Sequence, residues 1–197
     1  MSLESKIDEF QSDFNTTLKN LDLKKVESLY KKLISLRKNQ GRLFLAGMGG
    51  SAANASHATN DFRKICDINT ICLNDNISEL TARINDENPE DIFANILSGH
   101  NPNNEDLVMV FSVGGGSRKN NTSINLFELL KYAKSEGLTT CSIVGKSKCL
   151  VEEVSDIFIT FNLDKLLNIT PIAETMQVYL WHFLCSYEKL KTNNTKW

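Results

Sequence analysis

The sequence predicts an α/β fold, a three-layer sandwich in which helices cover both faces of a parallel, doubly wound sheet of about five strands. Short apolar runs alternate along the chain with amphipathic segments, and two of the runs end in glycine-rich turns. Strands that alternate with helices form a parallel sheet with right-handed crossovers. The expected strands span residues 42–46, 69–73, 106–112, 139–144 and 157–161.

Helices are expected between these strands, where apolar residues recur at three- and four-residue spacing. The same spacing predicts one or two amphipathic helices before residue 40. The helical ranges expected after that point are 52–63, 79–84, 91–97, 124–136, 149–154 and 172–190, the last being a long C-terminal helix. We therefore expect a single flavodoxin-like domain over residues 41–191, preceded by a helical segment over residues 1–40. A polar tail over residues 191–197 is expected to fray.

The first helical segment lies outside the sheet unit, yet it has an apolar face. The residues of that face are Ile7, Phe10, Phe14 and Leu18. An apolar helical face needs a partner, either the same domain or a second subunit. We therefore expect a homo-oligomer, specifically a tetramer.

The composition indicates an ordinary globular protein, with 41% hydrophobic and 23% charged residues. A net charge of -2 gives no reason to expect nucleic acid or an anionic membrane as a partner, because both select basic surfaces. No stretch approaches the roughly 18 apolar residues of a membrane span, and no signal peptide is evident. The five scattered cysteines contain no CxxC pair and read as core residues of a reducing compartment. A cytoplasmic protein is expected.

The two glycine-rich turns, Gly49–Ala52 and Ser112–Ser117, each join a predicted strand to a helix. The carboxyl ends of parallel strands meet at one edge of the sheet, where ligands bind in doubly wound folds. A helix N-terminus offers unpaired N–H groups to an anion, so both turns are candidate phosphate sites. The alternative is that the glycines only make tight turns. Neither turn has the spacing of a nucleotide-binding loop, which disfavours a nucleotide.

Two histidines pair with carboxylates at helical spacing. His57 and Asp61 are four residues apart on one predicted helix, and Glu174 and His182 are eight apart on another, about 12 Å along its axis. These side chains could bind a divalent metal such as zinc or transfer protons. Glu174 and His182 reach one ion only when fully extended, so a second subunit would supply one helix end more easily. The alternative is two packed histidines and two solvated carboxylates.

Four segments together resemble the sugar isomerase (SIS) domain, specifically the phosphoheptose isomerases. The segment GMGGSAANASHATNDFRK (47–64) is similar to the GNGGSAxxxxH motif of that family. Residues 73–93 resemble the stretch that ends in an Asn-Asp pair, residues 111–117 stand at the Ser-rich phosphate loop, and residues 174–182 match a Gln or Glu followed eight residues later by His. The similarity runs from about residue 42 to 190.

The resemblance implies that the two glycine-rich turns hold a sugar phosphate through backbone N–H groups and serine hydroxyls, while the Asn-Asp pair holds sugar hydroxyls. The implied substrate-binding residues are Gly49, Gly50, Ser51, Asn85, Asp86, Ser112, Gly114, Ser117 and Glu174.

The same resemblance implies catalytic roles for two residues, Asp61 as base and His182 as acid. It implies a divalent metal, zinc, held by His57, Asp61, Glu174 and His182. The chain departs from the family pattern at some of these places: Asp61 stands for the usual Glu and Glu174 for a Gln. Glutamate for glutamine adds negative charge, which favours a bound metal ion.

The implied function is a phosphosugar isomerase that converts sedoheptulose 7-phosphate to a heptose 7-phosphate by acid/base chemistry through an enediol. Val113 and Gly114 replace residues that are often hydroxylated in the phosphate loop, and Met48 replaces an Asn. These changes keep open an alternative, a non-catalytic SIS module that binds a sugar phosphate or a protein partner.

Overall fold

The computed structural model describes residues 2–164, 166 and 168–195. Within them lies one sheet of five parallel strands in the order β2-β1-β3-β4-β5, which is the flavodoxin order. The strands are β1 (Leu43–Gly47), β2 (Thr70–Cys72), β3 (Leu107–Ser112), β4 (Thr139–Val144) and β5 (Ile157–Thr160). The predicted fold class is confirmed.

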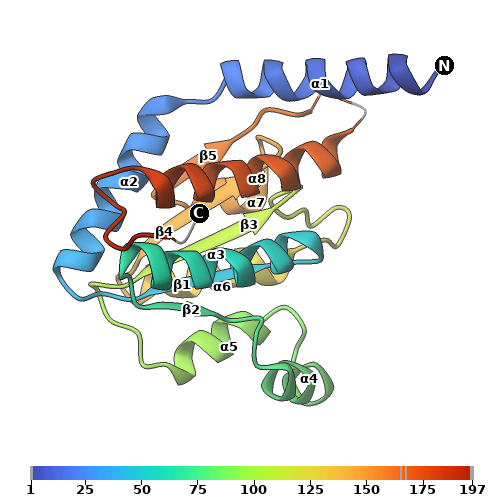
Figure 1. The fold of residues 1–197 in the computed structure, drawn as a ribbon. Coiled ribbons are helices and arrows are strands. Elements are labelled where there is room, and N and C mark those ends of the chain that lie inside the picture. The colour runs from blue at the N-terminus through green and yellow to red at the C-terminus, as the bar shows by residue number, and fades with distance from the viewer. Residues whose placement is uncertain (1, 165, 167, 196–197) are drawn as a thin grey trace.

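Helices cover both faces of this sheet (Figure 1). Their bounds are α1 (Leu3–Lys19), α2 (Leu23–Lys38), α3 (Gly50–Cys66), α4 (Ile77–Asp86), α5 (Ile92–Gly99), α6 (Ile124–Ser135), α7 (Leu150–Val154) and α8 (Ile169–Ser186). Helices α2, α3 and α8 pack on one face, and α5, α6 and α7 pack on the other. Among the described residues, no helix is both long and apolar enough to cross a bilayer.

The side chains of the strands explain why helices pack on both faces of the sheet. In β1, Leu43 and Leu45 belong to the core beneath α3 and α8, whereas Phe44 and Ala46 belong to the core beneath α5 and α6. Successive side chains of a strand point to opposite faces, so a strand that is apolar throughout must be buried on both. All five cysteines are free thiols buried in these cores.

The closing helix α8 begins and ends earlier than the predicted range 172–190. Pro171 is compatible with its first turn, where the missing N–H would have no partner. At the other end the backbone of Tyr187 is extended, and the chain turns so that Leu190 is fully buried. The Arg37 guanidinium donates to the Leu190 carbonyl at 2.6 Å and fixes this turn.

The predicted fraying of the C-terminal tail is wrong for its described residues, which lie against the end of α3. The N–H groups of Thr192 and Asn193 donate to the Ile65 carbonyl at 2.9 and 3.0 Å, and the Asn193 amide donates to the Lys64 carbonyl at 3.0 Å. The last carbonyls of a helix have no intrahelical donor, so a polar tail can satisfy them. Residues 196 and 197 lie outside the described part of the chain.

The start of β4 depends on Asp156, and its stability should therefore depend on pH. Burial acts to raise the pKa of Asp156, but the N–H and hydroxyl of Thr140 and the Lys134 ammonium together hold this pKa below its usual range. A carboxyl group whose pKa is depressed by folding stabilises the fold above its unfolded pKa of about 3.9, and this contribution is lost as pH falls through the folded pKa.

We expect Asp156→Asn to lower the Tm at pH 7, and we expect the difference from wild type to shrink as pH falls below the unfolded pKa of about 3.9 and through the lower folded pKa. Differential scanning calorimetry of both proteins from pH 7 to pH 2.5 measures this. A difference that stays constant across the acid range would contradict a role for the ionised carboxylate.

Candidate active site

Helices α3 and α8 run side by side (Figure 1). At their contact the Asp61 carboxylate lies between two imidazoles. Its Oδ2 atom is 3.2 Å from His182 Nδ1 and 3.7 Å from His57 Nε2. Asp61 is buried, while the side chains of His57 and His182 are 55% and 48% exposed. A buried carboxylate is thus connected to solvent through two half-exposed imidazoles.

These three side chains fit a divalent metal as well as proton transfer. One ligand atom from each lies within 4.8 Å of the others. Catalytic zinc sites use three protein ligands of the His and carboxylate types and keep a fourth position open for water or substrate. His57, Asp61 and His182 match that donor set, which supports a metal site without identifying the ion.

Two further donors hold Asp61, and neither was assigned a role from the sequence. The Asn60 amide donates to Asp61 Oδ1 at 3.0 Å, and the Trp181 indole N–H donates to Oδ2 at 3.4 Å. The one sequence feature that could have indicated a role for Trp181 is its position next to His182. Residues adjacent in a helix normally face different directions, so this feature predicts no shared contact. Packing of α8 on α3 brings both side chains to the same carboxylate.

Glu174, the predicted fourth metal ligand, is not part of this group. Its carboxylate lies against the Cα of Gly50 in the first turn of α3, where any Cβ would collide with it. The Asn54 amide donates to the Glu174 carbonyl at 3.0 Å and so fixes α8 here. Gly50 and Asp61 are separated by about 16 Å along α3, because each helical residue rises about 1.5 Å.

The first glycine-rich turn contains a buried polar atom without a partner. Gly49 has a positive φ of 59° and caps α3, which suits glycine. The Ser51 hydroxyl behind it is buried and, among the described residues, forms no hydrogen bond. An anion at this helix N-terminus would satisfy that hydroxyl.

The second glycine-rich turn borders a polar cavity of about 600 Å³. The Ser112 hydroxyl accepts from the Gly115 N–H at 3.0 Å, and the Ser117 hydroxyl accepts from the Asn120 N–H at 3.3 Å. The cavity is lined by Gly114, Ser117, Asn120, Thr122, Lys146, Ser147, Lys148, Cys149 and Asp164. Lys146 and Lys148 therefore supply positive charge beside the predicted phosphate loop. Neither lysine was predicted from the sequence.

Asn85 and Asp86, the predicted sugar-hydroxyl ligands, are exposed at the end of α4. The Asn85 amide donates to the Asp86 carboxylate at 2.7 Å. No contact within the described residues ties either side chain to Asp61 or to the glycine-rich turns. Their role in substrate binding stays a prediction.

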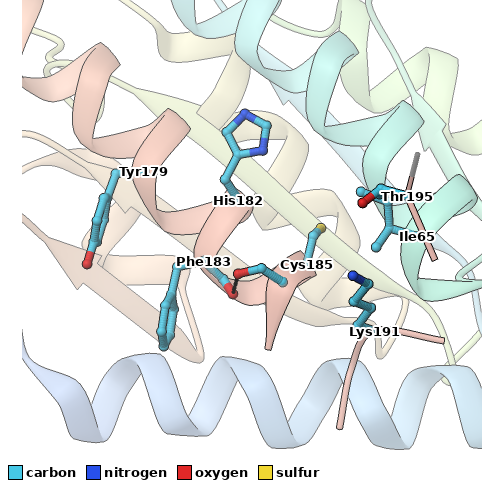
Figure 2. Close-up of a pocket in the computed structure, with 8 residues that line it drawn as sticks. Ile65, Tyr179, His182, Phe183, Cys185, Lys191 and Thr195 are labelled. Carbon is cyan, nitrogen blue, oxygen red and sulfur yellow. Dashed lines mark hydrogen bonds between the residues drawn. The ribbon is translucent and has the colours of Figure 1, made fainter. Parts of the chain in front are cut away.

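Two cavities, each of about 550 Å³, open at His182. One also contains His57, Asp61 and residues Asn194 and Thr195 of the tail. Figure 2 shows the other, in which Lys191 and Thr195 of the tail lie beside Ile65 of α3 and across from Phe183 of α8. The tail thus forms one wall of the space that the imidazoles face.

The family of the chain follows from a comparison with protein-family models, in which the SIS domain matches residues 9–145. The chain belongs to the SIS domain family. Both glycine-rich turns, His57 and Asp61 lie within the matched residues, and His182 lies beyond them.

Relatives of this SIS domain include phosphoheptose isomerases. It is 30% identical over 173 residues to a probable phosphoheptose isomerase of Thermoplasma acidophilum, covering 85% of this chain and 88% of that protein. It is 29% identical over 160 residues to the phosphoheptose isomerase of Helicobacter pylori strain P12, covering 78% and 77%. Lincomycin biosynthesis protein LmbN of Streptomyces lincolnensis is 31% identical over 151 residues, but the chain spans only 54% of its length.

Solved structures show the same fold. Phosphoheptose isomerase GmhA from Neisseria gonorrhoeae superposes with a TM-score of 0.78 at 18% identity, over 93% of this chain and 97% of the other. A phosphoheptose isomerase from Francisella tularensis gives 0.77 at 21% identity, over 94% and 97%. The predicted family is confirmed, and with it the predicted enzyme class, an aldose-ketose isomerase.

Proposed function

We propose that this SIS domain interconverts a ketose phosphate and an aldose phosphate through an enediol, with sedoheptulose 7-phosphate and a heptose 7-phosphate as the substrate pair. The observation that carries the proposal is the contact of 3.2 Å between Asp61 and His182, beside a second imidazole, in a chain related to phosphoheptose isomerases. The reaction needs one base, one acid and no redox partner.

In the proposed mechanism, Asp61 takes the proton from C1 of the ketose while His182 gives a proton to the carbonyl oxygen on C2. The resulting enediol then loses the proton of its C1 hydroxyl and gains one at C2, which leaves an aldose with no net change of atoms. Burial of Asp61 and exposure of His182 suit a base held in place and an acid that exchanges protons with solvent.

We also propose that His57, Asp61 and His182 hold a divalent metal, zinc, in the working enzyme. A bound metal would polarise the sugar carbonyl and stabilise the oxyanion that develops on it. Convergence of the three ligand atoms within 4.8 Å supports this proposal. Glu174 could complete the set only from another copy of the chain, because its own copy directs it to Gly50.

The phosphate of the substrate would bind at the glycine-rich turns, where Ser51 lacks a partner and Lys146 and Lys148 line the polar cavity. An extended seven-carbon phosphate is about 10 Å long at roughly 1.5 Å per bond, shorter than the 16 Å or so from Gly50 to Asp61. One substrate therefore does not reach from Gly50 to Asp61 within one chain, and a site shared between copies resolves the mismatch.

This mismatch supports the predicted homo-oligomer, a tetramer. Exposed apolar residues on the first two helices, Leu3, Ile7 and Leu23, offer surface for contact between copies. Light scattering at micromolar concentration tests it, and a monomer would contradict both the oligomer and the shared site.

Five buried free thiols support the further proposal of a cytoplasmic location, because thiols persist in reducing compartments.

We expect Lys146→Ala and Lys148→Ala each to raise the KM for the phosphosugar about tenfold while kcat is kept, because charge-assisted contacts to phosphate contribute to ground state and transition state alike. Lys119→Ala is the matched control, since Lys119 is an exposed lysine of the neighbouring loop that does not line the cavity. Steady-state kinetics measure the effect. A change in kcat without a change in KM would place these lysines outside the phosphate site.

The function itself is tested by incubating the protein with a panel of ketose phosphates in deuterated water. NMR spectra should show aldose formation and deuterium uptake at C1 or C2. Binding of a sugar phosphate without either signal would favour the alternative, a non-catalytic SIS module, which the hydroxyl-poor loop at Val113 and Gly114 keeps open.

A further inference from the structure

We propose that Trp181 is a positioning residue that fixes the Asp61 carboxylate for proton transfer, through its indole N–H and through ring contacts with both imidazoles. This inference rests on the proposed function, in which Asp61 is the base. It concerns a residue to which the family motif assigns no role.

The hydrogen bond from Trp181 is of a different kind from the other contacts of Asp61 Oδ2. The indole N–H is a donor only, and it stays protonated at every working pH. Trp181 is 1% exposed, so no water competes for this N–H, and Asp61 Oδ2 accepts it at 3.4 Å. His57 and His182 are about half exposed to water, so Trp181 is the fully buried partner of this oxygen.

The indole ring is itself held firmly. It stacks on Phe111 of β3, with centroids 5.9 Å apart and planes at 22°. The ring also contacts both imidazoles: the centroid of His57 lies 5.4 Å away, and that of His182 lies 5.1 Å away. The sheet thus supports the indole, and the indole supports all three side chains of the candidate site.

The need for such support follows from the length of the base. Asp61 is one methylene shorter than glutamate, so its oxygens stay close to α3 and have only two side-chain torsions to aim them. With Asn60 on Oδ1 and Trp181 on Oδ2, each oxygen has a fixed donor. Rotation about χ2 would break both hydrogen bonds, so the carboxylate presents one orientation to a substrate.

The test compares Trp181→Phe, which keeps an aromatic ring and removes the N–H, with Phe93→Leu, a buried ring truncated on the opposite face of the sheet. Trp181→Phe should lower kcat roughly tenfold with KM within about twofold, the lower end expected for a lost hydrogen bond to a charged group. Phe93→Leu should lower the Tm and leave kcat unchanged. A Trp181→Phe protein with wild-type kcat and a lower Tm would overturn the proposal.

A second readout does not depend on turnover. In a ¹H–¹⁵N NMR spectrum, the indole signal of Trp181, assigned by its loss in Trp181→Phe, should move in Asp61→Asn because its carboxylate acceptor is replaced by an amide. An unchanged chemical shift of the indole signal would overturn the proposed contact between Trp181 and Asp61. If wild type converts no phosphosugar but the signal moves, the proposed function fails while the contact between Trp181 and Asp61 stands.

Discussion

His182→Gln is expected to lower kcat by roughly 10² to 10⁴, the usual scale for a lost proton-transfer group, with KM largely kept. Glutamine has similar length and polarity but cannot give and retake a proton near neutral pH. The side chain of His182 is half exposed, so the Tm should change by only a few degrees. Steady-state kinetics and thermal unfolding of the same preparation measure both effects.

His100→Gln is the matched control, because it makes the same substitution on the opposite face of the sheet. The His100 ring packs against Phe44, 5.5 Å between centroids, and contacts no member of the candidate site. It should leave kcat unchanged. If His182→Gln instead keeps full turnover and lowers the Tm, His182 is a structural residue, and the binding-module alternative gains weight.

The fold could be predicted because its determinants are local. The fully apolar run of β3 can be buried only inside a sheet covered on both faces, and the glycine-rich turns mark where strands end and helices begin. The ends of α8 were less predictable. Burial of Leu190 and its hydrogen bond with Arg37 depend on α2, which is distant in sequence.

The candidate site was predictable only where its contacts form within one helix. The spacing of His57 and Asp61 within one helix is enough to bring them together. For Glu174 and His182, eight residues at about 100° each leave the side chains about 80° apart around the helix axis, so they face different neighbours. The contacts of Trp181 and His182 with Asp61 depend on how α8 is rotated against α3, and neither helix alone determines that rotation.

Asp106→Ala is expected to lower the free energy of unfolding by about 3 to 5 kcal/mol, the largest stability effect that a single ion pair should give here. The Asp106 side chain is fully buried before β3. It accepts from the Arg42 guanidinium at 2.6 Å, from the Arg42 backbone N–H at 2.7 Å and from the Asn103 N–H at 3.0 Å. Alanine would leave a mostly buried guanidinium and two N–H groups without this acceptor, and the cost of each unpaired group adds to the loss.

Glu105→Ala is the matched control for this substitution, because Glu105 is the neighbouring carboxylate and is exposed, and within the described part of the chain it accepts only the Asn39 amide, at 2.8 Å. It should cost less than about 1 kcal/mol. Urea unfolding at one fixed protein concentration measures both variants, since an oligomer's stability depends on concentration. Equal losses for the two variants would contradict the role of burial, because the two carboxylates are adjacent in sequence and differ chiefly in exposure and in the number of donors that each accepts.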